Sequence, residues 1–257
     1  MSAGTELGLT YDAAFYATLD ADVSASAAAV APIVAGLLHP ASVLDVGCGR
    51  GTWLAAFVRL GVTDVLGVDG SHVATADLEV PAAAFLARDL TRPLRLDRRF
   101  DLVTSLEVAE HLPEACASDF VASLVAHGGA VLFSAAVPGQ GGAGHVNEQW
   151  PSYWAARFAD HGYVPIDAVR PVVWNDHRVA YWYAQNTLLY VDETNATMRR
   201  LREVQPAPTL LDVVHPGLLA QVAAMRRTSP PASLSRLLRD VPAAARRAVR
   251  HRMGRSR

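Results

Sequence analysis

Val43-Leu44-Asp45-Val46-Gly47-Cys48-Gly49-Arg50-Gly51-Thr52 decides the fold of this chain. The stretch starts as an apolar run typical of a buried strand, continues with three glycines at alternate positions and then opens a helix. Glycine lets a backbone turn sharply and lie against a ligand where any Cβ would collide. The stretch therefore predicts a strand, a ligand-binding turn and a helix, in that order.

Short apolar or β-branched runs alternate with helical stretches around this turn, a pattern typical of βαβ units that build a parallel sheet. The runs predict strands near residues 42–46, 64–69, 84–87, 101–105 and 130–134. Helices are predicted over 26–38, 52–60 and 113–127. Two later strands, at 163–170 and 187–191, should close the sheet as an antiparallel hairpin. The sequence thus predicts a doubly wound α/β fold with a seven-stranded, mostly parallel sheet and helices on both faces.

Composition and the positions of glycine and proline divide the chain into three parts. We expect an N-terminal helical cap (1–41), a ligand-binding domain (42–192) and a helical, arginine-rich C-terminal extension (193–257). The 257 residues are 51% hydrophobic and 19% charged, as in a globular protein with one sizeable core. No secretion signal is visible, Cys48 and Cys116 have no disulfide spacing, and polar residues, Gly or Pro interrupt each apolar stretch. These features predict a cytoplasmic protein without a membrane span.

The charges are unevenly distributed, and all 23 basic residues are arginine. The segment Arg226–Arg257 holds ten arginines and one acid, Asp240, so its formal charge is +9 and that of the remainder is −11. A nucleic-acid-binding face should be basic, so the acidic remainder argues against such a role. The basic segment is either a solvated helix or a contact for polyanions.

Acidic residues follow the first three predicted strands and suggest how a ligand is held. Asp45, just before Gly47 and Gly49, suits a cationic amino group, while the amides of the turn suit a carboxylate. Asp69, which ends the second strand before Gly70, is placed for a ribose diol. Asp89 and Leu90 follow the third strand and suit the amino group and the face of an adenine. A glycine-rich turn without any ligand is the simpler alternative. The glycine spacing also differs from the Gly-x-Gly-x-x-Gly fingerprint of nicotinamide-binding proteins.

From Tyr11 to Val191 the order of these motifs resembles that of the class I methyltransferases that depend on S-adenosylmethionine (SAM). The segments that carry the resemblance are the Asp45–Thr52 turn, Asp69, Asp89, the strand at Phe100–Val103 and its exit Glu107–Leu112. The resemblance implies SAM as the cofactor and a sheet with the strand order 3-2-1-4-5-7-6.

Glu107, Glu110 and His111 lie at positions i, i+3 and i+4 after the fourth strand, where a helical turn would place them on one face. Two close carboxylates repel each other unless a cation lies between them. The Glu-x-x-Glu-His run and the later His145 resemble the metal sites of small-RNA 2′-O-methyltransferases and of ubiquinone-pathway O-methyltransferases. That resemblance implies Glu107, Glu110, His111 and His145 as ligands of Mg²⁺ or Mn²⁺. In the metal-free alternative, which stays open, His111 or His145 is the catalytic base.

A glycine-rich stretch, Gln140–Gly144, immediately precedes His145 and predicts a mobile lid at the mouth of the site. Glu148 and Trp150 follow it, and Trp174 belongs to a second aromatic group near the predicted hairpin. We expect these three residues to line the pocket for the methyl acceptor.

Methyl transfer to an alcohol needs alignment of the reactants and removal of one proton, and these residues supply candidates for both tasks. The sequence therefore predicts a SAM-dependent O-methyltransferase that acts on a small molecule such as a sugar or another product of secondary metabolism. A nucleic-acid methyltransferase that uses the basic tail and a non-catalytic SAM-binding protein are the alternatives. The acceptor, the acceptor atom and the oligomeric state are left open.

Overall fold

The computed structural model describes residues 13–195, 199, 201, 203, 208 and 210–228 of the chain. Within the chain, Tyr11–Leu219 form one compact unit that contains the whole sheet. Met1–Thr10 and Ala220–Arg257 belong to a second unit. Most of the arginine-rich segment therefore lies outside the described residues, and its predicted role stays a prediction.

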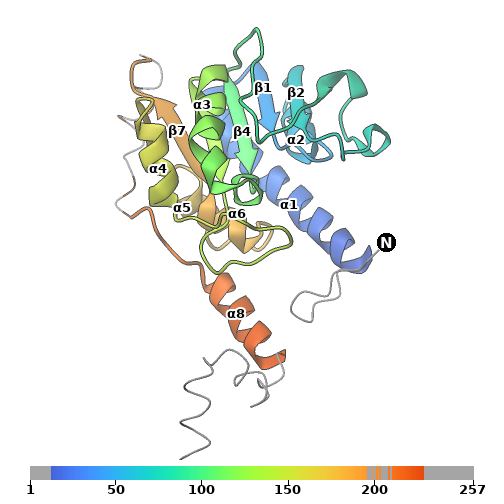
Figure 1. The fold of residues 1–257 in the computed structure, drawn as a ribbon, viewed down its shortest axis with the longest axis vertical. Helices are drawn as coiled ribbons and strands as arrows, with labels where there is room; N and C mark the ends of the chain where they lie inside the picture. The colour runs from blue at the N-terminus through green and yellow to red at the C-terminus, as the bar shows by residue number, and fades with distance from the viewer. Residues whose placement is uncertain are drawn as a thin grey trace, which may run out of the picture. The chain divides into compact units, whose positions relative to one another are not determined.

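A single sheet of seven strands forms the centre of the Tyr11–Leu219 unit (Figure 1). Its strand order is β3-β2-β1-β4-β5-β7-β6, which confirms the order implied by the sequence resemblance. The first five strands pair in parallel, and β7 pairs antiparallel with both β5 and β6. The strands are β1 (Ser42–Val46), β2 (Asp64–Asp69), β3 (Phe85–Ala87), β4 (Leu102–Leu106), β5 (Ala130–Ser134), β6 (Tyr163–Ile166) and β7 (Leu188–Asp192).

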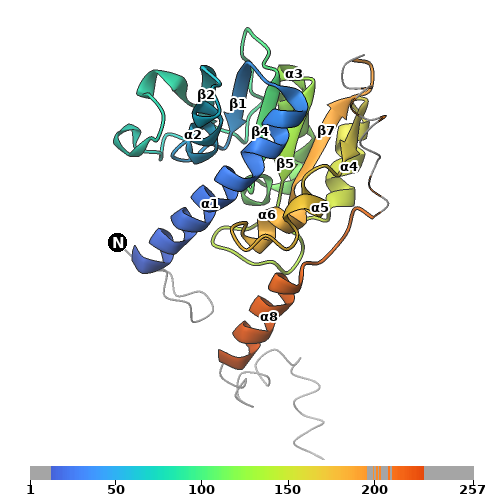
Figure 2. The same cartoon turned by 180° about the vertical axis from the view of Figure 1, so that it is seen from behind.

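Helices cover both faces of the sheet, as the two opposite views show (Figures 1 and 2). The helices are α1 (Ala13–Leu38), α2 (Thr52–Arg59), α3 (Ala117–His127), α4 (Pro151–Ala159), α5 (Arg170–Val173), α6 (Tyr181–Asn186) and α8 (Pro216–Thr228). Apolar residues of α1, α2, α5 and α6 share one core cluster, and those of α3 and α4 share the other. Successive strand residues belong to opposite clusters, as Val43 and Leu44 do, because side chains alternate across a strand. The central strands are therefore buried on both sides.

Three helices of the structure were not predicted from the sequence. The helix α4 was missed, although Pro151 at its first position is a recognisable start signal. The predicted strand 163–170 ends at Ile166, and Arg170 opens the short helix α5. The aromatic segment that follows contains α6, for which no helix was predicted. These three helices all flank the hairpin half of the sheet, where the βαβ alternation stops and no longer guides a prediction.

The segment Asp20–Leu38 of α1 has the length and composition of a membrane span, with a mean hydropathy of 1.7. The expectation that polar residues interrupt every such stretch was therefore too strong. The same segment supplies four residues with no exposed surface to the core cluster around α2, namely Ala27, Val30, Ala31 and Val34. An apolar helix is what a core position in an α/β fold requires.

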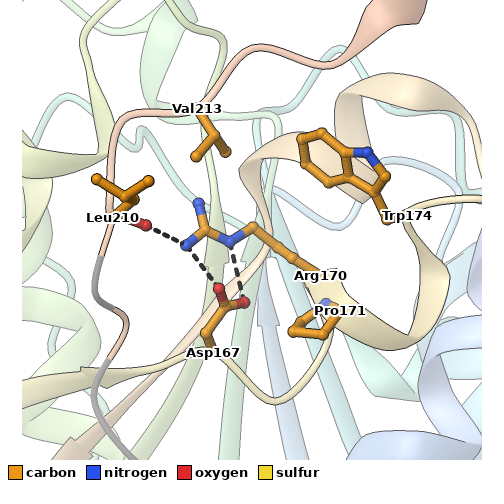
Figure 3. Close-up of a pocket in the computed structure, with 6 residues that line it drawn as sticks. All are labelled: Asp167, Arg170, Pro171, Trp174, Leu210 and Val213. Carbon is orange, nitrogen blue, oxygen red and sulfur yellow. Dashed lines mark hydrogen bonds and ion pairs between the residues drawn. The ribbon is translucent and has the colours of Figure 1, made fainter.

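An extended segment, residues 210–215, crosses the end of the unit that holds α4, α5 and α6, and we call it the strap. The guanidinium of Arg170, which is 3% exposed, donates two hydrogen bonds to Asp167 and one each to the carbonyls of Leu210 and Leu211 (Figure 3). Asp212 accepts hydrogen bonds from the backbone N–H and the hydroxyl of Ser152, in the first turn of α4. The strap thus ties α4 and α5 together.

Candidate functional site

The glycine turn joins β1 to α2 at the carboxyl edge of the sheet, the edge at which ligands bind in open α/β folds. Gly47 has a φ of +84°, and a Cβ on it would lie 2.3 Å from a methyl carbon of Val108. The Asp69 carboxylate accepts hydrogen bonds from the backbone N–H of Gly49 (2.7 Å) and of Gly70 (2.6 Å). Asp69 therefore holds the turn in place and keeps one lone pair on each oxygen for ribose hydroxyls.

A cavity of about 470 Å³ opens beside this turn. Most of the residues predicted to bind the cofactor line it, together with two of the predicted metal ligands. The lining residues are Gly47, Asp69, Gly70, His72, Arg88, Asp89, Leu90, Thr91, Glu107, Val108, His111 and Leu112. The structure thus brings the cofactor turn and the exit of β4 to one cavity.

Asp45 is buried (2% exposed) instead of being displayed on the cavity wall. Its Oδ1 accepts a hydrogen bond from the Thr104 hydroxyl at 2.7 Å, whereas its Oδ2 has no hydrogen-bond partner among the described residues. Burial raises the pKa of Asp45 to about 7, although the Thr104 hydroxyl lowers it. A buried oxygen without a donor fits a ligand that brings one, such as the ammonium group of SAM.

Asp89 and Leu90 also line the cavity, and they lie two and three residues after the end of β3. Asp89 Oδ1 accepts hydrogen bonds from the N–H and the hydroxyl of Thr91, which lowers the pKa of Asp89. Its carboxylate is therefore ionised and fixed in direction, as an acceptor for an amino group should be. Leu90 offers the apolar surface that a base ring needs.

Three predicted ligands meet at the exit of β4. Ligand atoms of Glu110, His111 and His145 all lie within 4.8 Å of one another, and the two imidazole rings are 4.9 Å apart between centroids. They do not share the face of an α-helix, because Glu107 has a left-handed φ of 55° and only a short 3₁₀ turn, Ala109–His111, follows. Glu110, His111 and His145 therefore meet through a short turn and a loop and not on one helical face, and Glu107 lies next to them.

Glu110 has no exposed surface, and neither of its carboxyl oxygens has a hydrogen-bond partner among the described residues. Burial raises the pKa of Glu110 well above its usual value, and the neighbouring carboxyl of Glu107 raises it further. Burial also lowers the pKa of His111, and the nearby His145 lowers it further. A divalent cation between these groups would supply the positive charge that the buried carboxyl lacks.

The glycine-rich stretch predicted to be a mobile lid is held by Glu148. The two carboxylate oxygens of Glu148 accept hydrogen bonds from the backbone N–H of Gly139 (2.8 Å) and of Gly141 (2.7 Å). The same carboxylate lies 2.9 Å from Nδ1 of His145. Backbone N–H groups of Val146 and Asn147 donate to the carbonyl of Glu110 and hold the end of the stretch against the site. Glu148 therefore orients His145, with Nε2 left for a ligand, and is not displayed in an acceptor pocket.

Replacing Glu148 by Ala should loosen this stretch. Two amides then lose a charged acceptor, a loss of about 1.5–3 kcal/mol each, so we expect hydrogen exchange of residues 139–147 to accelerate about tenfold or more. Exchange measured by mass spectrometry checks this result, with Glu114→Ala as the control because Glu114 is exposed and outside the stretch. Unchanged exchange would mean that Glu148 does not hold the lid closed.

The tryptophans predicted for the acceptor pocket lie elsewhere. Trp150 is 36% exposed and precedes α4, and it does not contribute to the lining of the cavity. Trp174 lines a different, smaller pocket beside Arg170 and the strap (Figure 3). Sequence reasoning also missed Gln140 and Asn186, which donate hydrogen bonds to Glu107. No local motif marks these two amides, because they come from a loop after β5 and from the end of α6.

Comparisons with known proteins agree with this geometry. Residues 21–170 match a family described as methyltransferase domain. The chain therefore belongs to the class I SAM-dependent methyltransferases. No curated protein matches it in sequence.

Solved structures of low sequence identity share the fold. The sugar N-methyltransferase KedS8 from a Streptoalloteichus species is 20% identical, with a TM-score of 0.53 over 74% of this chain and 98% of its own. SAM-bound CalS10 from Micromonospora echinaspora, an amino pentose methyltransferase, is 18% identical, with a TM-score of 0.51 over 71% and 98%. Magnesium protoporphyrin IX methyltransferase from Synechocystis with bound S-adenosylhomocysteine (SAH) is 18% identical, with a TM-score of 0.52 over 70% and 87%.

Proposed function

We propose that this enzyme transfers the methyl group of SAM to a hydroxyl of a small molecule, with the help of a divalent cation. The single observation that carries the proposal is the buried Glu110 carboxyl, which has no partner among the described residues and lies within 4.8 Å of His111 and His145. A buried carboxylate is costly unless a cation compensates it. Through His111 the cluster borders the cavity in which Asp69 and Asp89 are placed to hold the ribose and the adenine of SAM.

The donor set bears on the identity of the cation. Glu110 offers a carboxylate oxygen, whereas His111 and His145 offer imidazole nitrogens. Imidazole suits transition metals, and Mg²⁺ prefers oxygen ligands and retained waters. We therefore propose Mn²⁺ in preference to Mg²⁺. When bound, such an ion would lower the pKa of the acceptor hydroxyl.

The residues of the chain have tasks of their own in the reaction. The glycine turn and Asp69 fix the cofactor, and Glu148 fixes His145 through Nδ1. His111 borders the cavity, and its lowered pKa keeps it neutral at pH 7, so its single lone pair is available to the cation. That property also favours the metal-free alternative, in which His111 alone is the base.

The acceptor class we propose is a sugar or another hydroxylated product of secondary metabolism. Two solved structures with this fold are described as a sugar N-methyltransferase and an amino pentose methyltransferase, so sugars are the first compounds to test. A nucleic-acid acceptor is less consistent with the acidic charge of residues outside the basic tail. A cytoplasmic location and the division at residues 41 and 192 remain predictions.

Transfer of a radioactive methyl group from SAM to a panel of hydroxylated sugars and aglycones tests the proposal. We expect product only with an acceptor that carries a free hydroxyl, loss of activity with EDTA, and recovery with Mn²⁺ beyond that with Mg²⁺. Full activity in EDTA would exclude the cation and leave His111 as the base. Methylation of amines alone would overturn the hydroxyl assignment.

A further inference from the structure

Hydrogen bonds hold both the carboxyl group and the backbone N–H of Glu107. Gln140 donates an amide N–H to Oε2 at 2.8 Å, and Asn186 donates one to Oε1 at 3.1 Å. The backbone N–H of Glu107 donates to the carbonyl and the hydroxyl of Ser134. Its left-handed φ of 55° is sparsely populated by residues other than glycine, so the backbone at Glu107 is strained. The surrounding structure thus imposes one position on Glu107.

The direction of each amide is set by a backbone group that can only donate. The N–H of Val137 donates to Oε1 of Gln140, so the NH₂ group of Gln140 must face Glu107. Asn186 Oδ1 accepts from the NH₂ group of Gln185, whose own Oε1 accepts from the N–H of His215 at 2.7 Å. The strap, which contains His215, therefore fixes the direction of Asn186 through Gln185.

The amides that hold Glu107 are themselves buried. Gln140 is 5% exposed, Asn186 is 3% exposed and Gln185 has no exposed surface. Amides in such surroundings cost free energy unless all their groups are paired. Towards Glu107 these amides present only N–H donors, one to each carboxyl oxygen, so together they fix the direction of its side chain.

Resting on the proposed function, we propose that Gln140 and Asn186 are positioning residues that fix the Glu107 carboxyl, through both of its oxygens, beside Glu110. The Glu107 and Glu110 carboxyls lie close enough to interact. Two carboxylates balance the charge of a divalent cation held by Glu110, His111 and His145, whereas Glu110 alone leaves one positive charge uncompensated. Gln140 and Asn186 touch neither the cation nor SAM, and they act through Glu107.

Binding of Mn²⁺ to the full chain, followed by the electron paramagnetic resonance signal of the free ion, tests this proposal. The variants Asn186→Leu and Gln140→Met keep side-chain size and remove the amide donors. We expect each to weaken Mn²⁺ binding about tenfold or more, the lower end of what loss of a hydrogen-bonding partner around a metal site costs, while SAH affinity by calorimetry stays unchanged. Unchanged SAH affinity also shows that each variant is folded.

Ser123→Ala is the matched control, because Ser123 is 5% exposed and its hydroxyl links α3 to the backbone of Leu94, outside the cavity. It should lower the melting temperature and leave Mn²⁺ binding unchanged. A wild-type chain that binds no Mn²⁺ overturns the cation in the proposed function and this inference with it. A wild-type chain that binds Mn²⁺, with both amide variants binding it equally well, overturns the inference alone.

Discussion

Glu110→Gln should abolish methyl transfer, with turnover lower by about 100-fold or more and SAH affinity unchanged. Glutamine keeps the size of the side chain and removes the negative charge that a cation needs. Glu110 forms the candidate cation site together with His111 and His145, whereas Asp69 and the glycine turn hold the cofactor. Single-turnover rates and calorimetry with SAH measure the two effects separately.

The same variant should be more stable than the wild type when no cation is present. The folded-state pKa of Glu110 is raised by burial, so the unfolded chain releases this proton at lower pH than the folded chain does. Wild-type stability must then fall as the pH rises above the ordinary glutamate pKa, and glutamine removes that loss. Denaturant unfolding of both proteins at pH 5 and pH 8 measures this difference in the free energy of unfolding.

A Glu110→Gln enzyme with normal turnover would show that this carboxyl takes no part in the reaction.

Gly47→Ala should abolish cofactor binding. The new Cβ would lie 2.3, 2.5 and 2.9 Å from three atoms of the Val108 side chain, in a backbone with φ at +84°. Overpacking and the left-handed backbone together cost about 2–5 kcal/mol, and displacement of the turn to relieve that strain should weaken SAH binding by about 100-fold or more. Calorimetry with SAH measures the loss.

Two further variants separate the clash from the backbone strain. Gly61→Ala has a φ of +96° with nothing within 4 Å of the new Cβ, so it should cost about 1 kcal/mol of stability and leave SAH binding intact. Adding Val108→Ala to Gly47→Ala opens the space that the Cβ needs and should restore part of the affinity. Equal losses in Gly47→Ala and Gly61→Ala would contradict the assignment of the turn to the cofactor.

The half of the fold that binds the cofactor could be predicted from sequence because its signals are local. The turn at Gly47–Gly51 lies between a buried strand and a helix within ten residues, and Asp69 and Asp89 each follow a strand. The bounds of β1 and β2 were predicted without error for the same reason. In this half the sequence pattern that marks a strand end also marks a cofactor-binding residue, since polar groups at these strand ends line the cavity.

The acceptor half could be predicted only in part. Glu110, His111 and His145 were grouped correctly, but by an α-helical spacing that the left-handed Glu107 does not allow. Glu148 was placed in the pocket, whereas it accepts backbone hydrogen bonds from the loop. Contacts such as Asn186 to Glu107 join residues 79 positions apart. Hydrophobic periodicity carries no information on polar pairs at such separations.

The strap also has a consequence for the order in which the chain matures on the ribosome. The glycine turn, Glu107 and β5 are synthesised well before His215. The backbone N–H of His215 donates to Gln185, Gln185 donates to Asn186, and Asn186 donates to Glu107. At about 5–20 residues per second, the roughly 110 residues between Glu107 and His215 take on the order of 5–20 s to be made. During that interval a nascent chain is able to form the cofactor turn before its acceptor side is fixed. The hydrogen bond from His215 therefore forms only after all seven strands of the sheet have been synthesised.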